Sequence, residues 1–273
     1  TPCANKFKQV CPKMPSGILG KRALWPLKPN AKTIYSIPIL NKQTDVLGTA
    51  LLDYWEGDTA TRLVTWTSLT DEEDLDVGYF FRLFSQMPEL EQKALQLAKG
   101  RILDVGCGPG SHSLYLQAQG KNVTALDYSA KSIAVAKKRG VKQTVHADFF
   151  DFDTPAFDTI LMLMNGAGVA QTLEGLPDLF SQFEQYLTPK GQVLIDSSDL
   201  QYLFEDNLGL LPQNNYHGEV MFGTRYKGNS EEFPWLYIDE KLLTQCATQM
   251  GWRCELLLKG SHWDYLARLT REY

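Results

Sequence analysis

The sequence predicts an α/β fold in which helices flank a mostly parallel sheet, and three observations support this. Residues 101–103 form a short apolar run that leads into a glycine-rich turn, and a segment with a helical pattern follows. Residues 122–127 read as a second strand that ends in an acid. Residues 157–164 contain a continuous apolar run without alternation, which is typical of a parallel strand buried on both faces.

The glycine-rich turn is the most informative stretch of the chain. It begins at Asp104 and continues through Gly106, Cys107, Gly108 and Gly110. Glycines at alternate positions let the backbone bend sharply and let a ligand lie against bare main chain. The following helix directs unpaired N–H groups and the positive end of its dipole to the same place, which favours an anionic group. The spacing differs from the G-x-G-x-x-G fingerprint of dinucleotide-binding proteins, which disfavours a nicotinamide-dependent oxidoreductase.

The stretch from Asp104 to Gly110 resembles the first motif of class I S-adenosylmethionine-dependent methyltransferases. The resemblance implies a Rossmann-like, seven-stranded, mostly parallel sheet. It also implies S-adenosyl-L-methionine as the cofactor and S-adenosyl-L-homocysteine as the product. Asp104 would orient the glycine loop near the methionine end of the cofactor, and the loop from Gly106 to Gly110 would pack under it.

The second strand supplies a candidate for binding the ribose. Asp127 stands at its end, where an acid can accept hydrogen bonds from both ribose hydroxyls, and Tyr128 follows it. The alternative is that Asp127 caps the next helix, although Ser129 is better placed for that role. We therefore expect Asp127 and Tyr128 to belong to the cofactor site.

Two later loops complete the expected cofactor site. The resemblance implies that Asp148 holds the adenine amino group and that Phe149 lines the adenine ring. The alternative is an ordinary loop acid beside a core phenylalanine. The loop at Asn165 follows the apolar run, at the edge where parallel sheets bind ligands, and the resemblance implies contact with cofactor and substrate there.

The rest of the chain continues the α/β pattern, so we place the cofactor-binding methyltransferase domain at residues 99–273. A helix is expected over 173–187 and a strand over 192–198. Asp239 is expected to cap a helix that runs to about Met250, and residues 252–259 and 263–270 to form two closing strands. Residues 207–238 read as an inserted β-hairpin whose arms flank Lys227-Gly228-Asn229.

Two segments precede this domain. Residues 1–44 contain eight Lys or Arg, no Asp or Glu and six prolines, so we expect a basic, irregular extension. Residues 45–98 are expected to form a helical lid that shapes the substrate pocket, with helices over 45–55 and 87–99. Within the lid, we expect the acidic run 71–76 to be a solvated surface that starts a helix, and Tyr79 to face the pocket.

Composition sets limits on partners and location. Five cysteines without C-x-x-C spacing do not indicate a disulfide framework or a zinc site, and no other metal-ligand spacing is present, so we expect no metal. No stretch is apolar enough to span a bilayer and none reads as a signal peptide, which favours a cytoplasmic protein. Residues 45–273 carry 19 Lys or Arg against 32 Asp or Glu, which disfavours nucleic acid.

The predicted function is transfer of a methyl group to a small-molecule acceptor by in-line displacement. The acidic body, the apolar lid and the absence of an N-P-P-Y motif favour a small acceptor. Since positioning supplies much of the catalysis, a base is optional, and His262 and Tyr79 are the candidates. A protein- or RNA-directed methyltransferase and a non-catalytic S-adenosylmethionine-binding protein remain alternatives.

Overall fold

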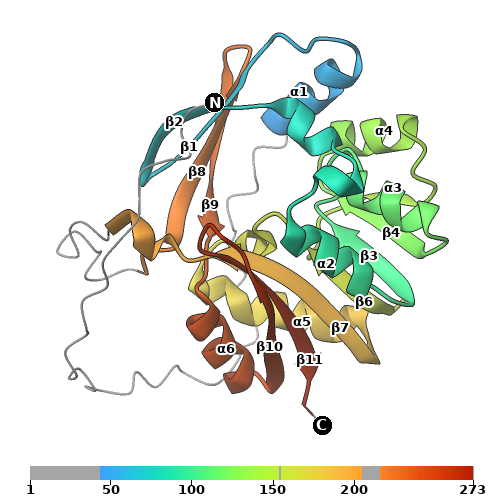
Figure 1. Cartoon of the computed structure of the whole chain (residues 1–273), viewed down its shortest axis with the longest axis vertical. Coiled ribbons are helices and arrows are strands. Elements are labelled where there is room, and N and C mark those ends of the chain that lie inside the picture. Colours follow the sequence, from blue (N-terminus) through green and yellow to red (C-terminus); the bar gives the residue numbers. More distant parts are fainter. Residues whose placement is uncertain (1–43, 154, 205–215, 273) are drawn as a thin grey trace. The chain divides into compact units, whose positions relative to one another are not determined.

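The structure is a computed structural model, and it describes residues 44–153, 155–204 and 216–272. The expectation of a basic extension falls almost entirely on residues 1–43, which lie outside the described residues. So does part of the predicted insertion, residues 207–215. The described residues form two β-sheets with associated helices (Figure 1).

The larger sheet has seven strands in the order β10-β11-β7-β6-β3-β4-β5. The pairs β3–β4, β3–β6, β4–β5 and β6–β7 are parallel, and β11 is antiparallel to both of its neighbours. This confirms the Rossmann-like, mostly parallel sheet that the sequence predicts. The strands are β3 (Arg101–Val105), β4 (Asn122–Asp127), β5 (Thr144–His146), β6 (Phe157–Met162), β7 (Leu187–Ser198), β10 (Trp252–Lys259) and β11 (Asp264–Arg271).

Helices cover both faces of this sheet, because successive side chains of a buried strand point to opposite faces. Ile102 of β3 packs in a cluster with Leu116 of α3, whereas Leu103 packs in another cluster with Phe183 of α5. One face carries α2 (Glu89–Leu97), α3 (Ser111–Ala118) and α4 (Ala130–Lys138), and the other carries α5 (Leu176–Tyr186) and α6 (Glu240–Gln249).

Helix starts follow the capping signals of the sequence. Ser129 caps α4 by accepting a hydrogen bond from the Ser132 N–H, and Asp239 caps α6 in the same way. Helix α1 (Val46–Trp55) begins after Asp45, whose side chain accepts from the Gly48 N–H. Short 3₁₀ helices are η1 (Val77–Phe81), η2 (Phe84–Gln86), η3 (Gly166–Ala170), η4 (Leu173–Gly175) and η5 (Leu200–Phe204). Of the helices described, none combines the length and the apolar character needed to cross a bilayer.

The smaller sheet is antiparallel and has four strands in the order β2-β1-β8-β9. Strands β8 (Glu219–Tyr226) and β9 (Asn229–Leu236) form the predicted inserted hairpin, and β9 begins directly after Gly228, earlier than expected. Strands β1 (Leu63–Thr67) and β2 (Thr70–Leu75) come from the segment that precedes the larger sheet. Because β1 pairs with β8, two distant parts of the sequence build this sheet together (Figure 1).

The expectation that the acidic run 71–76 starts a helix holds only at its end, where Asp76 caps η1 by accepting from the Gly78 N–H, because residues 70–75 form the edge strand β2. The lid segment therefore contains strands as well as its expected helices α1 and α2. Charged side chains suit an exposed edge strand, since they oppose pairing with another chain. Strand β2 pairs with β1, and β1 pairs in turn with β8, which lies about 150 residues further along the chain, so no local signal indicates the sheet as a whole.

Candidate active site

The glycine loop leaves bare backbone at the carboxyl end of β3. Gly106, Gly108 and Gly110 have φ angles of 67°, 52° and 84°, in the left-handed region that favours glycine. A Cβ atom at Gly106 or Gly108 would meet nothing within 4 Å, whereas one at Gly110 would lie 2.7 Å from Val141 Cγ2. The first two glycines therefore border open space, and the third is needed for packing. Cys107 is buried, and its N–H donates to Leu126 O at 3.0 Å.

Asp127 joins this loop to the start of α4. Its side chain is 7% exposed, and its two carboxylate oxygens accept hydrogen bonds from the Gly108 and Ser129 N–H groups, both at 2.8 Å. Burial raises the pKa of Asp127 to about 6. Tyr128 follows it with a partly exposed side chain. The acid predicted to bind the ribose thus lies beside the bare glycines, and its ribose-binding role stays a prediction.

Beneath the loop, Asp104 belongs to a buried network of charges. The Ser113 hydroxyl donates to Asp104 Oδ2 at 2.7 Å, and His112 Nδ1 lies 3.9 Å from Asp104 Oδ1. The other ring nitrogen of His112 lies 2.7 Å from Glu91 Oε2, and Arg82 binds the second oxygen of Glu91. Burial raises the pKa of Asp104. This network fixes the end of β3 to α2 and α3, and only its Asp104 member was predicted as a site residue.

The segment around η1 is fastened to the glycine loop. The guanidinium of Arg82 lies 3.8 Å from the centroid of the Tyr79 ring, and the Ser111 hydroxyl donates to Phe80 O at 2.6 Å. Arg139, the C-cap of α4, donates to Pro109 O at 2.7 Å. Tyr79 is 39% exposed, and burial of the rest raises its pKa. The lid segment thus reaches the cofactor loop through specific polar contacts.

The candidates for binding adenine are adjacent in sequence but differ in environment. Asp148 is exposed, and its Oδ1 accepts from the Phe150 N–H at 2.9 Å. Phe149 is buried, with ring centroids 6.1 Å from Phe183 and 5.4 Å from Tyr186. Phe149 therefore has a packing role in the core. The adenine-binding roles of Asp148 and Phe149 stay predictions.

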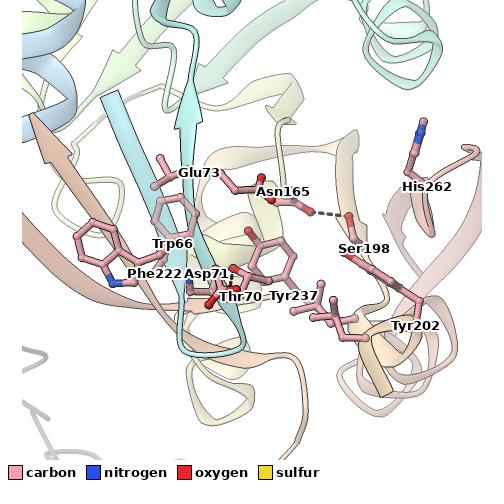
Figure 2. Close-up of a pocket in the computed structure, with 14 residues that line it drawn as sticks. Trp66, Thr70, Asp71, Glu73, Asn165, Ser198, Tyr202, Phe222, Tyr237 and His262 are labelled. Carbon is pink, nitrogen blue, oxygen red and sulfur yellow. Dashed lines mark hydrogen bonds between the residues drawn. The ribbon is translucent and has the colours of Figure 1, made fainter. Parts of the chain in front are cut away.

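A cavity of about 270 Å³ lies between the smaller sheet and the carboxyl ends of β6 and β7 (Figure 2). Asn165 and Ser198 line it from those strand ends, and the Ser198 hydroxyl donates to Asn165 Oδ1 at 2.9 Å. His262, in the turn between β10 and β11, also lines it, whereas Tyr79 is not among its lining residues. The remaining lining residues are Thr65, Trp66, Thr67, Thr70, Asp71, Glu73, Leu200, Tyr202, Leu203, Phe222 and Tyr237.

Asp196 holds the loop that presents Asn165 to this cavity. Its carboxylate accepts the N–H groups of Met164 and Gly166, both at 3.0 Å, and burial raises its pKa to about 7. Met164 and Asn165 both have positive φ angles, 65° and 60°, so the loop has a strained backbone that the hydrogen bonds to Asp196 hold in place. A buried acid at the end of the predicted strand 192–198 was the available signal, but sequence reasoning did not select it.

His262 is exposed at the rim of the cavity, and its Nδ1 lies 2.9 Å from the Ser261 hydroxyl. The structure therefore places two predicted residues, Asn165 and His262, on one cavity. It places two others, Asp127 and Asp104, around the glycine loop of the adjacent strand β3. Across residues 44–153, 155–204 and 216–272, no group of three or more His, Cys, Asp or Glu side chains is arranged to hold a metal ion.

Comparison with known proteins identifies the family. A family model described as "Methyltransferase domain" matches residues 103–195. The crystal structure of an S-adenosylmethionine-dependent methyltransferase from Bacteroides fragilis, in complex with S-adenosyl-L-homocysteine, is 44% identical and has a TM-score of 0.78. That match covers 86% of this chain and 98% of the other. This chain belongs to the class I S-adenosylmethionine-dependent methyltransferases.

The cofactor of this methyltransferase is S-adenosyl-L-methionine. The residues fit it, because the open space over Gly106 and Gly108 lies beside the Asp127 carboxylate. A Streptomyces cypemycin N-terminal methyltransferase is 34% identical over 103 residues, which are 36% of this chain and 42% of that protein. A ubiquinone biosynthesis O-methyltransferase from Rickettsia conorii is 29% identical over 124 residues, 42% of each chain. The chain thus spans less than half the length of these two curated relatives.

Proposed function

We propose that this methyltransferase transfers the methyl group to a small-molecule acceptor bound in the cavity beside Asn165 and Ser198. The observation that carries the proposal is the position of this cavity. It lies at the carboxyl ends of β6 and β7, and β6 pairs with β3, which leads into the glycine loop. Ligands of such sheets bind at this edge. A volume of about 270 Å³ suits a small molecule rather than a folded partner.

The protein contributes mainly by positioning. When bound, S-adenosyl-L-methionine supplies an electrophilic methyl group on a sulfonium. Asp127 and the glycine loop hold the cofactor, and Asn165, fixed by Ser198 and Asp196, presents a polar surface to the acceptor. Correct orientation of two reactants supplies about 7–11 kcal/mol in favourable cases, so these fixed contacts carry much of the catalysis.

His262 is the proposed proton acceptor, because it lines the acceptor cavity and histidine is the side chain that most often serves as a general base in enzymes. Tyr79 is the second candidate and acts from the cofactor side, since it is held by Arg82 above the loop that starts α3. The relatives carry N-terminal and O-methyltransferase names, so their names leave the accepting atom open.

The acceptor class can be tested with radiolabelled S-adenosylmethionine. The protein is incubated with a cell extract separated by a filter into small molecules and retained protein and RNA. We expect label only in small molecules, and label confined to the retained fraction would support a macromolecular acceptor instead. Calorimetric binding of S-adenosyl-L-homocysteine without turnover in either fraction would favour the non-catalytic alternative.

The role of His262 can be tested in the same assay with His262→Gln. General acid–base catalysis contributes about 10²–10⁴-fold, so kcat should fall within that range. The Kd for S-adenosyl-L-homocysteine should stay unchanged, since the side chain lies at the acceptor cavity. An unchanged kcat in this variant would exclude His262 as the base.

A further inference from the structure

We infer that the acceptor is a cationic amine, methylated on nitrogen and held by Asp71 and Glu73 against aromatic side chains. This inference rests on the proposed function and specifies its substrate class. It is carried by three features of the acceptor cavity: the sign of its charges, the strand geometry that presents them, and the rings that surround them.

The charged side chains that line the cavity are acidic. Asp71 and Glu73 both line it, and no Lys or Arg does so within the part of the chain that the structure describes. Over the same residues, neither carboxylate has an ion pair or a side-chain hydrogen bond, whereas Glu72 between them pairs with Arg225. The cavity therefore carries negative charge that its own walls leave unbalanced.

Strand β2 presents these two acids to the cavity. Its pairing with β1 shifts register between the pairs Thr65–Glu73 and Thr67–Thr70, and on either side of Glu72 both Asp71 and Glu73 line the cavity. Glu72 is absent from the cavity and makes a salt bridge with Arg225. Glu73 lies opposite Thr65 of β1, which also lines the cavity. Figure 2 shows Glu73 reaching from its strand towards Asn165, in the loop that follows β6.

Aromatic side chains complete the wall. Tyr202, Phe222 and Tyr237 line the cavity with the acids, and Tyr202 stacks on Trp263 with ring planes 16° apart. An aromatic face attracts a cation through its quadrupole, and a carboxylate attracts it directly. The same carboxylates would repel an anionic acceptor. The hydroxyls of Tyr202 and Tyr237 have no hydrogen-bond partner among the described residues, so they are available to polar groups elsewhere on the substrate.

The chemistry requires a neutral nitrogen at the moment of transfer. The bound ammonium first loses a proton, to His262 or to water. The nitrogen lone pair then forms the new N–C bond as the C–S bond of the sulfonium breaks, and the electron pair of that bond remains on sulfur as a thioether. The methylated product leaves as an ammonium ion. Asp71 and Glu73 thus bind the substrate as a cation, and His262 or water accepts the proton before the neutral amine reacts.

The inference can be tested with three probes of similar shape: phenethylamine, phenethyl alcohol and hydrocinnamate. Their binding is measured by calorimetry on the full protein saturated with S-adenosyl-L-homocysteine. We expect the amine to bind about tenfold more tightly than the alcohol, which corresponds to one charged hydrogen bond, and the acid to bind most weakly. Equal binding of the three, tighter binding of the acid or absence of amine binding would overturn the inference.

The variant Asp71→Asn/Glu73→Gln should abolish the preference for the amine over the alcohol. Glu72→Gln is the matched control, because Glu72 lies between the two acids in sequence, does not line the cavity and pairs with Arg225, and it should retain the preference. A preference that survives the double substitution would exclude these acids. Binding of S-adenosyl-L-homocysteine is recorded for every variant, so failure of the amine inference is separable from failure of the methyltransferase site itself.

Discussion

Replacing Asp127 by asparagine tests the cofactor site at a buried acid. The two carboxylate oxygens already accept the Gly108 and Ser129 N–H groups at 2.8 Å. An amide keeps the size of the side chain, but it directs an NH₂ group at one of these donors and offers no charge to the ribose hydroxyls. A hydrogen bond to a charged group contributes about 1.5–3 kcal/mol, so the Kd for S-adenosyl-L-homocysteine should rise roughly tenfold to a hundredfold.

The same variant should change the pH dependence of stability in the cofactor-free protein. Burial raises the pKa of Asp127 from 3.8 to about 6, so the folded protein holds this proton more tightly than the unfolded chain. The resulting stabilisation is complete below about pH 4 and is lost as the pH rises through about 6. A shift of about two pKa units corresponds to about 3 kcal/mol. Asp127→Asn should lack this loss of unfolding free energy.

Calorimetry at neutral pH gives the Kd, and urea unfolding across the acidic range gives the stability. Asp178→Asn is the control, because Asp178 is an exposed acid in the first turn of α5, and it should leave both quantities nearly unchanged. An unchanged Kd in folded Asp127→Asn would refute the ribose-binding role. An unchanged pH dependence would refute the buried, proton-binding state of the free protein.

Three further predictions concern the surroundings of this acid. Gly108→Ala should lower the unfolding free energy by about 1–2 kcal/mol because of its positive φ, and its Cβ should also obstruct cofactor binding. Gly110→Ala should lower the unfolding free energy further, because its Cβ would lie 2.7 Å from Val141 Cγ2. Urea unfolding measures the stability of each variant and calorimetry its cofactor binding, and equal losses for the two variants in both measurements would contradict the prediction. Glu91→Gln leaves the buried Arg82 guanidinium without its carboxylate and alters the contact with His112, so the unfolding free energy in urea should fall by about 3–5 kcal/mol. A loss below about 1 kcal/mol would argue against a charged pair between Arg82 and Glu91. Asp148→Ala should raise the calorimetric Kd for S-adenosyl-L-homocysteine several-fold if it binds adenine, whereas a role limited to its turn would leave the Kd unchanged.

The sequence could predict the parts of the fold that depend on residues close together in the chain, such as helix caps and tight turns. Ser129 and Asp239 supply caps where helix ends need acceptors, and the strand–glycine–helix order around Asp104 determines where the cofactor loop must lie. Asp127 could be selected because the end of its strand and the glycine loop meet at one edge of a parallel sheet.

The parts that were not predictable depend on partners that are distant in the sequence. Glu91 joins Arg82 and His112 from three separate elements, and no spacing in the chain indicates this network. The acidic run of β2 becomes a strand because β1 is itself paired with β8. Asp196 accepts the backbone N–H groups of Met164 and Gly166 in the loop after β6. Its role in holding this loop is therefore apparent only once the structure places the ends of β6 and β7 side by side.

The smaller sheet also has a consequence for how the chain matures during synthesis. An isolated two-stranded hairpin is marginally stable in water, so the β1–β2 hairpin gains its support from β8 and β9. Val64 pairs with Arg225, and β9 ends at Leu236, so this support arrives after the glycine loop and Asp127 have left the ribosome. Pairing over such a separation is intrinsically slow. The glycine loop and Asp127 are therefore synthesised well before the smaller sheet can assemble, and β10 and β11, whose connecting turn carries His262, emerge after both.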